Sequence, residues 1–340
     1  GNVTYGCNDY TAAVLQLKAL MKQRIPYMNS TEREGLWNPL SSLFTMMTPY
    51  ALEAKQTQTA FTKNCYDALV MSKSFLLESE RSMYDVIKRM GTPEDMHDYT
   101  TLASMKNQVK AWEKDYNANA DSILSVSRKA SRLENLLMNR CKGYSEGTDF
   151  MDVDYDAVKH ALGQNEVLID FTDYISQTQG RKYAAYIINK VQDYPLLKAL
   201  FAERQIDSLG IVRPDMYYSE DYSEDVLKLL WEPLKENVSA GATIYYVPSQ
   251  LLFQISLESL PLPDGSLLGS HYHFVRLSSA RELVKMKSES KGYKSNSAVL
   301  YGGLQYDLED SAMVEEAQKY DLSNLLALRG EIARGDSVFH

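Results

Sequence analysis

The stretch DVDYDAVKHALGQNEVLIDFTDY, residues 152–174, is where the periodicity of the sequence changes. Within it, Val167, Ile169 and Phe171 occupy every second position, which is the period of a β-strand. We predict further strands at residues 243–247, 251–256, 271–277 and 298–301, a hairpin turn at Asp264 and Gly265, and helices at residues 183–191, 195–201 and 224–237. Strands that alternate with helices are typical of an α/β fold.

Upstream of this stretch, apolar residues recur every three or four positions, which predicts amphipathic helices. The clearest helix has its apolar seam at Ile123, Val126, Ala130, Leu133 and Leu137. Residues 61–90 are predicted to form one long helix, with a seam made by Phe61, Cys65, Leu69, Ser72, Leu76, Ser79, Met83, Ile87 and Met90. We therefore expect antiparallel packing of long helices.

The ends of these helices also carry recognisable signals. Gly91 is expected to end the long helix, and Thr92 to cap the next one, with Pro93 at its first position and Asp95 in its first turn. Gly143 is expected to end the last helix. No clean 34-residue repeat is found, so a plain helical bundle is favoured over an intact tetratricopeptide array.

The polar, glycine-bearing stretch Lys142–Asp152 separates the two periodicities and predicts a domain boundary. We expect a helical domain over residues 1–145, formed by an antiparallel bundle or degenerate tetratricopeptide-like helices. An incomplete α/β domain is expected over residues 150–340. The predicted class is therefore α plus α/β.

Composition excludes several classes of function. The 340 residues have a formal charge of −9, and residues 1–150 carry 18 Lys and Arg against 17 Asp and Glu, while residues 151–340 carry 18 against 28. Nucleic acid is an unsuitable direct ligand, because neither half has a concentrated positive charge. No apolar run approaches the roughly 20 residues that cross a bilayer, so no membrane partner is expected. Three widely spaced cysteines indicate free thiols, which favours the cytoplasm.

Five segments downstream of residues 152–174 form an ordered set. They are WEPL at Trp231–Leu234, TIYYVPS at Thr243–Ser249, ISLESL at Ile255–Leu260 with Asp264 and Gly265, VRLSSAREL at Val275–Leu283, and YGGLQYD at Tyr301–Asp307. In this order and spacing the chain resembles the CHAT family of caspase-like cysteine peptidases. Residues 64–140 resemble the coiled segment that joins tetratricopeptide repeats to CHAT domains in bacterial proteins.

The resemblance implies a caspase-like sheet that carries a His/Cys pair, in which the histidine accepts the thiol proton and the thiolate attacks a peptide carbonyl. In the family the histidine precedes a glycine at a strand end, and the cysteine follows at the end of a later strand. Both are expected after the strand that here spans residues 298–303.

No histidine or cysteine of this chain matches that pattern. His97, His160, His271 and His273 are followed by Asp, Ala, Tyr and Phe, His340 is the last residue, and Cys7, Cys65 and Cys141 all lie in the helical region. We therefore assign no catalytic, cofactor-binding or metal-binding residue and expect no cofactor.

Three local groups of residues have simple structural explanations. A dyad of Cys141 and His160 is disfavoured, since nothing in the spacing enforces contact. His271 and His273 could share an ion on a strand, but two ligands are too few, and an exposed strand is favoured. The acidic stretch Asp215–Asp225 lacks the glycine of a calcium loop, so a solvated loop is favoured.

The expected function is that of the N-terminal and linker portion of a caspase-like endopeptidase, catalytically incomplete as it stands. It would scaffold the catalytic half and bind a protein or peptide partner through its helices. The alternative is a non-enzymatic interaction scaffold or pseudo-peptidase. An unrelated helical adaptor would lack the caspase-like strand order.

Overall fold

The computed structural model describes residues 3–54, 59–140 and 144–288, and they form two compact units. One unit combines the described residues up to Met83 with those from Tyr144 onward. The other runs from Tyr84 to Arg140. The class is α plus α/β, as predicted. The boundaries between the units lie in the polar stretch before residue 152 and at Met83, within a helix. The described residues up to Met83 therefore belong with the sheet and not with a separate helical domain.

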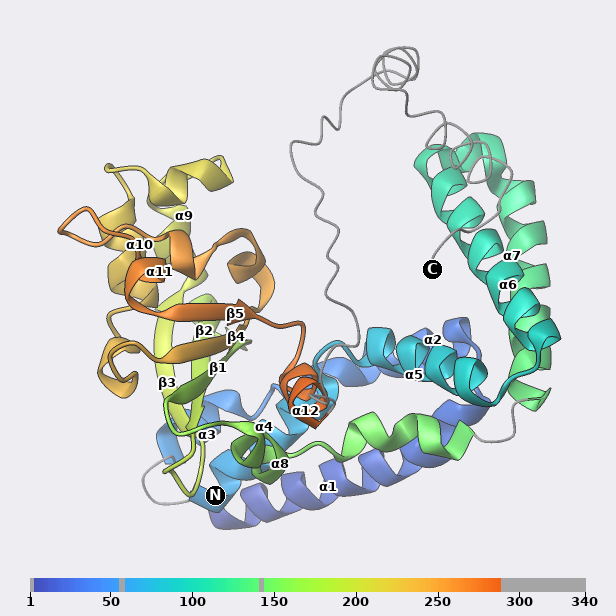
Figure 1. Ribbon diagram of the computed structural model, residues 1–340, viewed down its shortest axis with the longest axis horizontal. Helices are drawn as coiled ribbons and strands as arrows, with labels where there is room; N and C mark the ends of the chain where they lie inside the picture. The colour runs from blue at the N-terminus through green and yellow to red at the C-terminus, as the bar shows by residue number, and fades with distance from the viewer. Residues whose placement is uncertain (1–2, 55–58, 141–143, 289–340) are drawn as a thin grey trace, which may run out of the picture. The chain divides into compact units, whose positions relative to one another are not determined.

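The sheet has five strands in the order β3-β2-β1-β4-β5 (Figure 1). The strands are β1 (Glu166–Ser176), β2 (Gly180–Asn189), β3 (Leu196–Ala202), β4 (Thr243–Val247) and β5 (His273–Arg276). β1 is antiparallel to β2 and parallel to β4, β2 is antiparallel to β3, and β4 is parallel to β5. The sheet is therefore mixed, with three parallel strands at one end and a hairpin at the other.

Among the elements predicted after residue 152, several are confirmed and three are wrong. Strands β1 and β4 lie where expected, β5 begins two residues later than predicted, and residues 298–301 lie outside the described residues. The helices predicted at residues 183–191 and 195–201 are strands β2 and β3. The strand predicted at residues 251–256 is a 3₁₀-helix, Gln250–Gln254.

The error in β2 has a physical cause. Six consecutive residues of this strand are buried, from Tyr183 to Ile188, because both of its faces are covered. A strand buried on both sides shows no alternation of polar and apolar residues, so its period is hidden. Gly180 at φ +68° marks the turn of the β1–β2 hairpin.

Helices pack against both faces of the sheet (Figure 1). One face carries Val167, Ile169 and Phe171 and packs against the segments between residues 203 and 271. These contain α9 (Glu203–Asp207), α10 (Ser223–Leu230) and α11 (Leu268–His271), with the predicted helix at residues 224–237 ending early and continuing as a 3₁₀ turn, Lys235–Asn237. The unit is thus built in three layers.

The other face of the sheet packs against helices that precede β1 in the chain and against one that follows β5. These are α1 (Val3–Arg24), α3 (Thr48–Ala54), α4 (Thr59–Ser72), α8 (Tyr155–Ala161) and α12 (Ala280–Ser288). Tyr66 and Leu69 of α4 share this core with Leu168 and Tyr186 of the sheet. A third cluster joins Met21 and Trp37 to Phe75, in α1, α2 (Ser30–Leu40) and α5 (Phe75–Met90).

The predicted helix over residues 61–90 is two helices, α4 and α5, with a break at Lys73 and Ser74. Ser74 adopts φ +53°, a left-handed conformation that an α-helix cannot contain. The predicted seam positions Ser79, Met83 and Ile87 remain buried after the break, which is why the periodicity does not reveal it. Met90, the last predicted seam residue, is instead 56 % exposed. The break turns the backbone so that Lys73 can reach the sheet.

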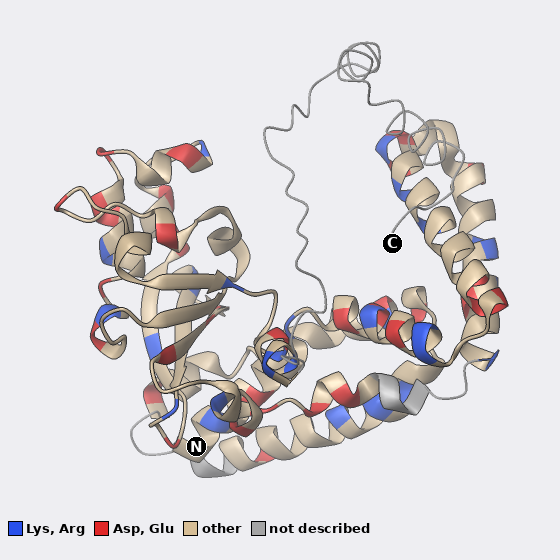
Figure 2. Ribbon diagram, in the orientation of Figure 1, with Lys and Arg blue, Asp and Glu red and all other residues tan. Residues whose placement is uncertain are grey.

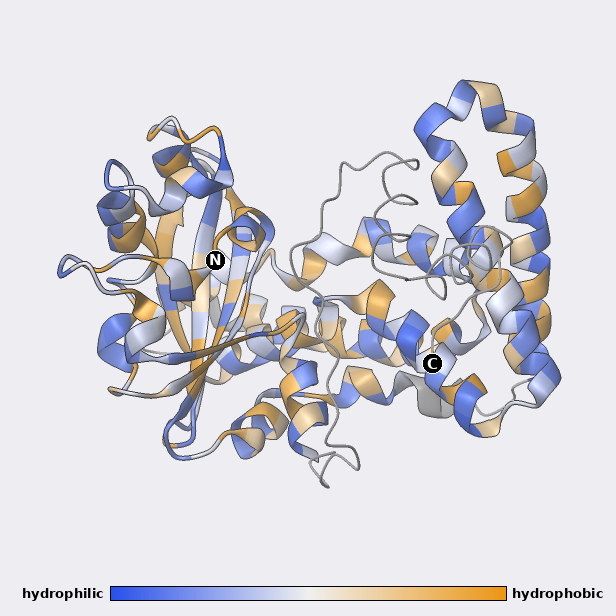
Figure 3. Cartoon of the chain, turned by 45° about the horizontal axis from the view of Figure 1, so that its top comes forward, coloured by the Kyte–Doolittle hydropathy of each residue, from blue (hydrophilic) through white to orange (hydrophobic). Residues whose placement is uncertain are grey.

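The second unit contains an antiparallel hairpin of α6 (Pro93–Trp112) and α7 (Tyr116–Arg140) (Figure 1). Arg140 at the end of α7 pairs with Glu94, Asp95 and Asp98 at the start of α6, which fixes the antiparallel register. Figure 3 shows hydrophobic and hydrophilic residues alternating along both helices. The predicted α7 seam is confirmed, since Ile123, Ala130 and Leu137 are buried. Gly143 lies outside the described residues.

The predicted cap of α6 is confirmed as a capping box. Thr92 Oγ1 accepts a hydrogen bond from the Asp95 amide at 3.2 Å, and Asp95 Oδ2 accepts one from the Thr92 amide at 2.9 Å. Two amides that a helix start leaves unpaired are thereby satisfied. Gly91 follows the end of α5, also as predicted.

We expect Thr92→Ala to destabilise the start of α6 by about 1 kcal/mol, because the amide of Asp95 loses its acceptor. Amide hydrogen exchange in the first turns of α6 should become about fivefold faster. The matched control is Thr101→Ala, which removes an exposed hydroxyl from the middle of the same helix. Equal effects of both substitutions would contradict a role for the capping box.

Candidate functional site

The strand order reverses between β1 and β4, because the chain runs from β1 outward to β2 and β3 and later from β4 outward to β5. Open α/β sheets bind their ligands in the crevice at such a point, beyond the carboxyl ends of the parallel strands. Here Asp170 of β1 lies level with Val247, the last residue of β4. This edge is therefore the candidate functional site.

Lys73 occupies the crevice. Its ammonium donates hydrogen bonds to Asp170 Oδ1 at 2.5 Å, to the carbonyl oxygen of Phe171 at 2.5 Å and to that of Val247 at 3.2 Å. An ammonium has three protons to donate, so all three are used. The lysine holds the end of β4 against the middle of β1.

Arg281, in the first turn of α12, connects this lysine to the rest of the edge. Its guanidinium donates to the carbonyl oxygens of Met71, at 2.9 Å, and Lys73, which lie at the carboxyl end of α4. Ser74 Oγ donates to the carbonyl of Ser278 at 3.0 Å. We call Lys73, Asp170 and Arg281 the strand-end cluster. It joins the α4–α5 break, the middle of β1, the end of β4, and the connection from β5 to α12.

Burial dominates the electrostatics of the strand-end cluster. The Asp170 side chain is fully buried and that of Lys73 is 14 % exposed. Loss of hydration raises the pKa of Asp170 and lowers that of Lys73, and the attraction between the two groups opposes both shifts. Burial also lowers the pKa of Arg281 to about 10. The charges of Lys73 and Asp170 compensate one another, whereas Asp170 Oδ2 and Arg281 Nε are buried without a hydrogen-bond partner among the described residues. The cluster fixes the end of β4 against the middle of β1.

A second polar group lies farther along β1. Asp173 Oδ1 accepts a hydrogen bond from Ser249 Oγ at 2.5 Å, and Asp173 also pairs with Arg181 of β2. Arg181 Nε lies 3.3 Å from Glu203 Oε2. These contacts tie the loop after β4 to the β1–β2 hairpin.

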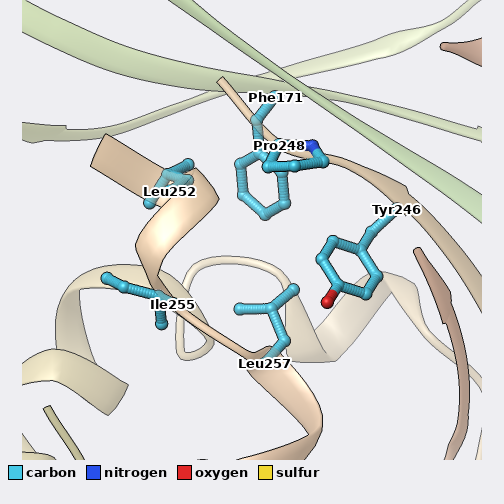
Figure 4. A pocket seen from close by; sticks show the side chains of 6 residues that line it. All are labelled: Phe171, Tyr246, Pro248, Leu252, Ile255 and Leu257. Atoms are coloured by element: carbon cyan, nitrogen blue, oxygen red, sulfur yellow. The ribbon is translucent and has the colours of Figure 1, made fainter. Parts of the chain in front are cut away.

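An apolar site lies on the other face of the sheet, lined by Phe171, Tyr246, Pro248, Leu252, Ile255 and Leu257 (Figure 4). The side chains point toward one another and leave essentially no free volume. The hydroxyl of Tyr246 donates to Glu258 Oε2 at 3.0 Å. This site is packed core that anchors the ISLESL segment against the sheet.

The cysteines that the structure describes are not placed for catalysis. Cys7 of α1 and Cys65 of α4 are both buried in the core between the helices and the sheet. Burial raises the pKa of each thiol, and the pKa of Cys65 rises further because Cys7 and Asp67 lie nearby. A raised pKa disfavours the nucleophilic thiolate. Cys141 lies outside the described residues, so the pair with His160 is not tested.

The histidines are placed by local structure. His160 in α8 has its Nδ1 atom 2.6 Å from the carbonyl oxygen of Asp156, one turn earlier. His271 ends α11 and His273 begins β5, so the two are not alternate residues of one strand as predicted. Among the described residues, no three His, Cys, Asp or Glu side chains gather as metal ligands would.

The β-turn at Asp264 and Gly265 is confirmed, with Gly265 at φ +81° and a bridge between Pro261 and Leu267. Next to it, Ser266 Oγ lies 2.8 Å from His271 Nε2 and 2.6 Å from Asp264 Oδ1. In a catalytic triad the carboxylate orients the histidine, whereas here it contacts the serine. Asp264 and His271 are exposed and Ser266 is half-buried, so this is a hydrogen-bond network that stabilises the turn.

The acidic stretch Asp215–Asp225 is only partly a solvated loop. Its carboxylates are exposed, but Tyr217 is buried and the hydroxyl of Tyr218 accepts a hydrogen bond from the amide of Ser256 at 2.8 Å. The acids face water and these two tyrosines face the protein. The stretch covers the core on the α10 side of the sheet.

The strand-end cluster was not predicted from the sequence. The one available signal was Asp170, a charged residue inside the apolar run of β1, since a buried carboxylate needs a partner. The partner itself was hidden, because Lys73 lies 97 positions earlier, within residues 61–90 that were predicted to form one continuous helix.

Comparison of the sequence with protein-family models and with curated proteins finds no match. Among the described residues, no helix has the length and apolar character needed to span a membrane.

Proposed function

We propose that this chain is the N-terminal and linker portion of a CHAT-type, caspase-like cysteine endopeptidase. It scaffolds the catalytic half and contributes no catalytic residue itself. The observation that carries the proposal is the parallel set β1-β4-β5, whose last member has a strand on only one side within the described residues. In parallel sheets both faces are normally covered by helices, and an open edge strand can pair with a further strand. Further strands of the catalytic half would therefore pair with β5.

The strand-end cluster supports this role. Catalytic groups of α/β proteins stand at the carboxyl ends of parallel strands, and their precision depends on a rigid support. Lys73 and Arg281 supply that support by joining the helices to this edge. Arg281 also lies in α12, the helix that follows β5 in the chain.

The first test assays this chain for peptidase activity. We expect this chain to cleave no peptide and to react with a cysteine-directed activity probe only through its ordinary thiols. Saturable peptide hydrolysis that is abolished by mutating Cys7, Cys65 or Cys141 would overturn the proposal.

The sequence that follows His340 separates the enzyme from its alternative. A histidine followed by glycine, and then a cysteine among small residues at a later strand end, would support the peptidase. Labelling of that cysteine by the activity probe should disappear in its Ala variant. Absence of both residues would favour a pseudo-peptidase or a non-enzymatic scaffold.

A further inference from the structure

A cleft of about 180 Å³ lies between α1, α4 and the residues that lead into α8. Its walls are apolar at Val14, Ala68, Met71 and Val153, and Leu15 at its rim is 60 % exposed. Typical small-molecule pockets measure roughly 300–1,000 Å³, so this one is the size of a single long side chain.

Two carboxylates line the cleft without an ion-pair partner. Asp67 of α4 accepts a hydrogen bond from the amide of Tyr155 at 2.7 Å, and Asp154 accepts one from the amide of Ala157 at 2.9 Å. Within the described residues, no Lys or Arg nitrogen comes within ion-pairing distance of either group. The lysines nearby are engaged elsewhere, Lys63 with Asp156 and Lys18 with Asp152.

Figure 2 shows acidic and basic residues gathered where the segment before α8 runs beside α1. The ionised form of Asp67 is poorly stabilised there, because burial and the neighbouring Asp154 and Asp156 raise its pKa to about 6. Its amide hydrogen bond and the more distant Lys63 oppose that shift. A cation brought into the cleft would compensate the uncovered charge.

We propose that this cleft binds one arginine or lysine side chain of a peptide partner. The methylene stem would pack on Met71, Ala68 and Val14, and the cationic head would pair with Asp67 and Asp154. A long cationic side chain suits such a site because its stem is apolar and its head is charged. The inference does not depend on the peptidase assignment, since every residue that carries it lies outside the strand-end cluster.

The test uses the full chain and N-acetyl-arginine amide as the probe, with binding followed by saturation-transfer NMR or calorimetry. A ligand of this size should bind with a Kd of about 1 mM at neutral pH. N-acetyl-citrulline amide, which has the same shape without the charge, should bind at least about tenfold more weakly, because the ionic interaction is lost.

Two variants locate the probe. Asp67→Asn and Asp154→Asn should each weaken arginine binding about tenfold, because each removes one charge-assisted hydrogen bond. Asparagine still accepts the hydrogen bond that caps α8, so the fold is kept. The control is Asp121→Asn, an equal change of charge at an exposed site in α7. It should leave the affinity unchanged.

Acidity provides an independent readout. Protonation of Asp67 should weaken arginine binding about tenfold between about pH 7 and pH 5, and this dependence should be absent in Asp67→Asn. The other charged groups around Asp67 are Lys63, Asp154 and Asp156, together with Lys18, which also lines the cleft.

Equal affinity for the arginine and citrulline probes, or binding that is insensitive to Asp67→Asn, would overturn the proposal. So would a failure of N-acetyl-arginine amide to bind. If a cationic side chain of this same chain filled the cleft, Asp67→Asn would destabilise the fold and the probe would not bind, and that outcome also overturns it.

Discussion

Replacing Lys73 with methionine is expected to lower the free energy of unfolding of the sheet-containing unit by about 3–5 kcal/mol. The substitution keeps much of the apolar stem but leaves Asp170 fully buried without the cation that contacts it. A lone buried carboxylate is far more costly than a buried pair. Urea denaturation followed by far-UV circular dichroism measures the change.

Two further variants test whether the loss comes from the buried charge. Lys63→Met breaks the pair with Asp156, whose side chains are 30 % and 54 % exposed, and should cost less than about 1 kcal/mol. The double variant Lys73→Met with Asp170→Val removes both charges and should recover most of the lost stability. If Lys73→Met costs no more than Lys63→Met, the strand-end cluster does not hold the sheet as described.

The second large effect concerns Asp67, whose pKa of about 6 lies above the ordinary value of 3.8. The folded state therefore keeps a proton that the unfolded chain has already lost, and this contribution to stability declines as the pH rises from about 4 to about 6. Asparagine resembles the protonated acid. Asp67→Asn should therefore raise the free energy of unfolding at pH 7 by about 2 kcal/mol, allowing for partial solvent screening.

The measurement is the difference between wild type and Asp67→Asn in urea denaturation at several pH values. It should be near zero at about pH 4 and grow toward about pH 7, because only the wild type titrates at this position. Other titrating groups contribute equally to the stability of both proteins, so they cancel in the difference. Glu166 is an example: burial raises its pKa, but its contacts with Lys287 and Gly163 lower the pKa by more. A difference that is constant with pH would contradict the assignment.

Together with the arginine probe, this variant separates binding from folding. Asp67→Asn is expected to make the protein more stable and its binding weaker. That combination of effects would be typical of a residue whose role is binding and not folding.

The sequence predicted those parts of the fold whose signals are local. The cap at Thr92, the turn at Gly265 and the seam of α7 depend on neighbours a few residues away, and each lies where expected. Strand β1 was found because Asp170 and Thr172 interrupt its otherwise apolar composition. Local chemistry of this kind leaves a pattern that one sequence can show.

The rest depends on contacts between distant parts of the chain. β2 was taken for a helix because helices cover both of its faces, and the α4–α5 break contains neither proline nor glycine. The left-handed backbone of Ser74 is maintained by tertiary contacts, among them the hydrogen bond from its hydroxyl to Ser278. The strand-end cluster joins residues up to 208 positions apart, so no local pattern could predict it.

The position of the α6–α7 hairpin within the chain has a consequence for biosynthesis. The helices before Met83 bury Cys65, Tyr66 and Leu69 against strands that a ribosome makes only after residue 144. At a synthesis rate of about 5–20 residues per second, those apolar surfaces stay uncovered for several seconds until the strands are made. The α6–α7 hairpin can form during this time. The helices before Met83 thus present an apolar surface that a chaperone can bind while the sheet is still being synthesised.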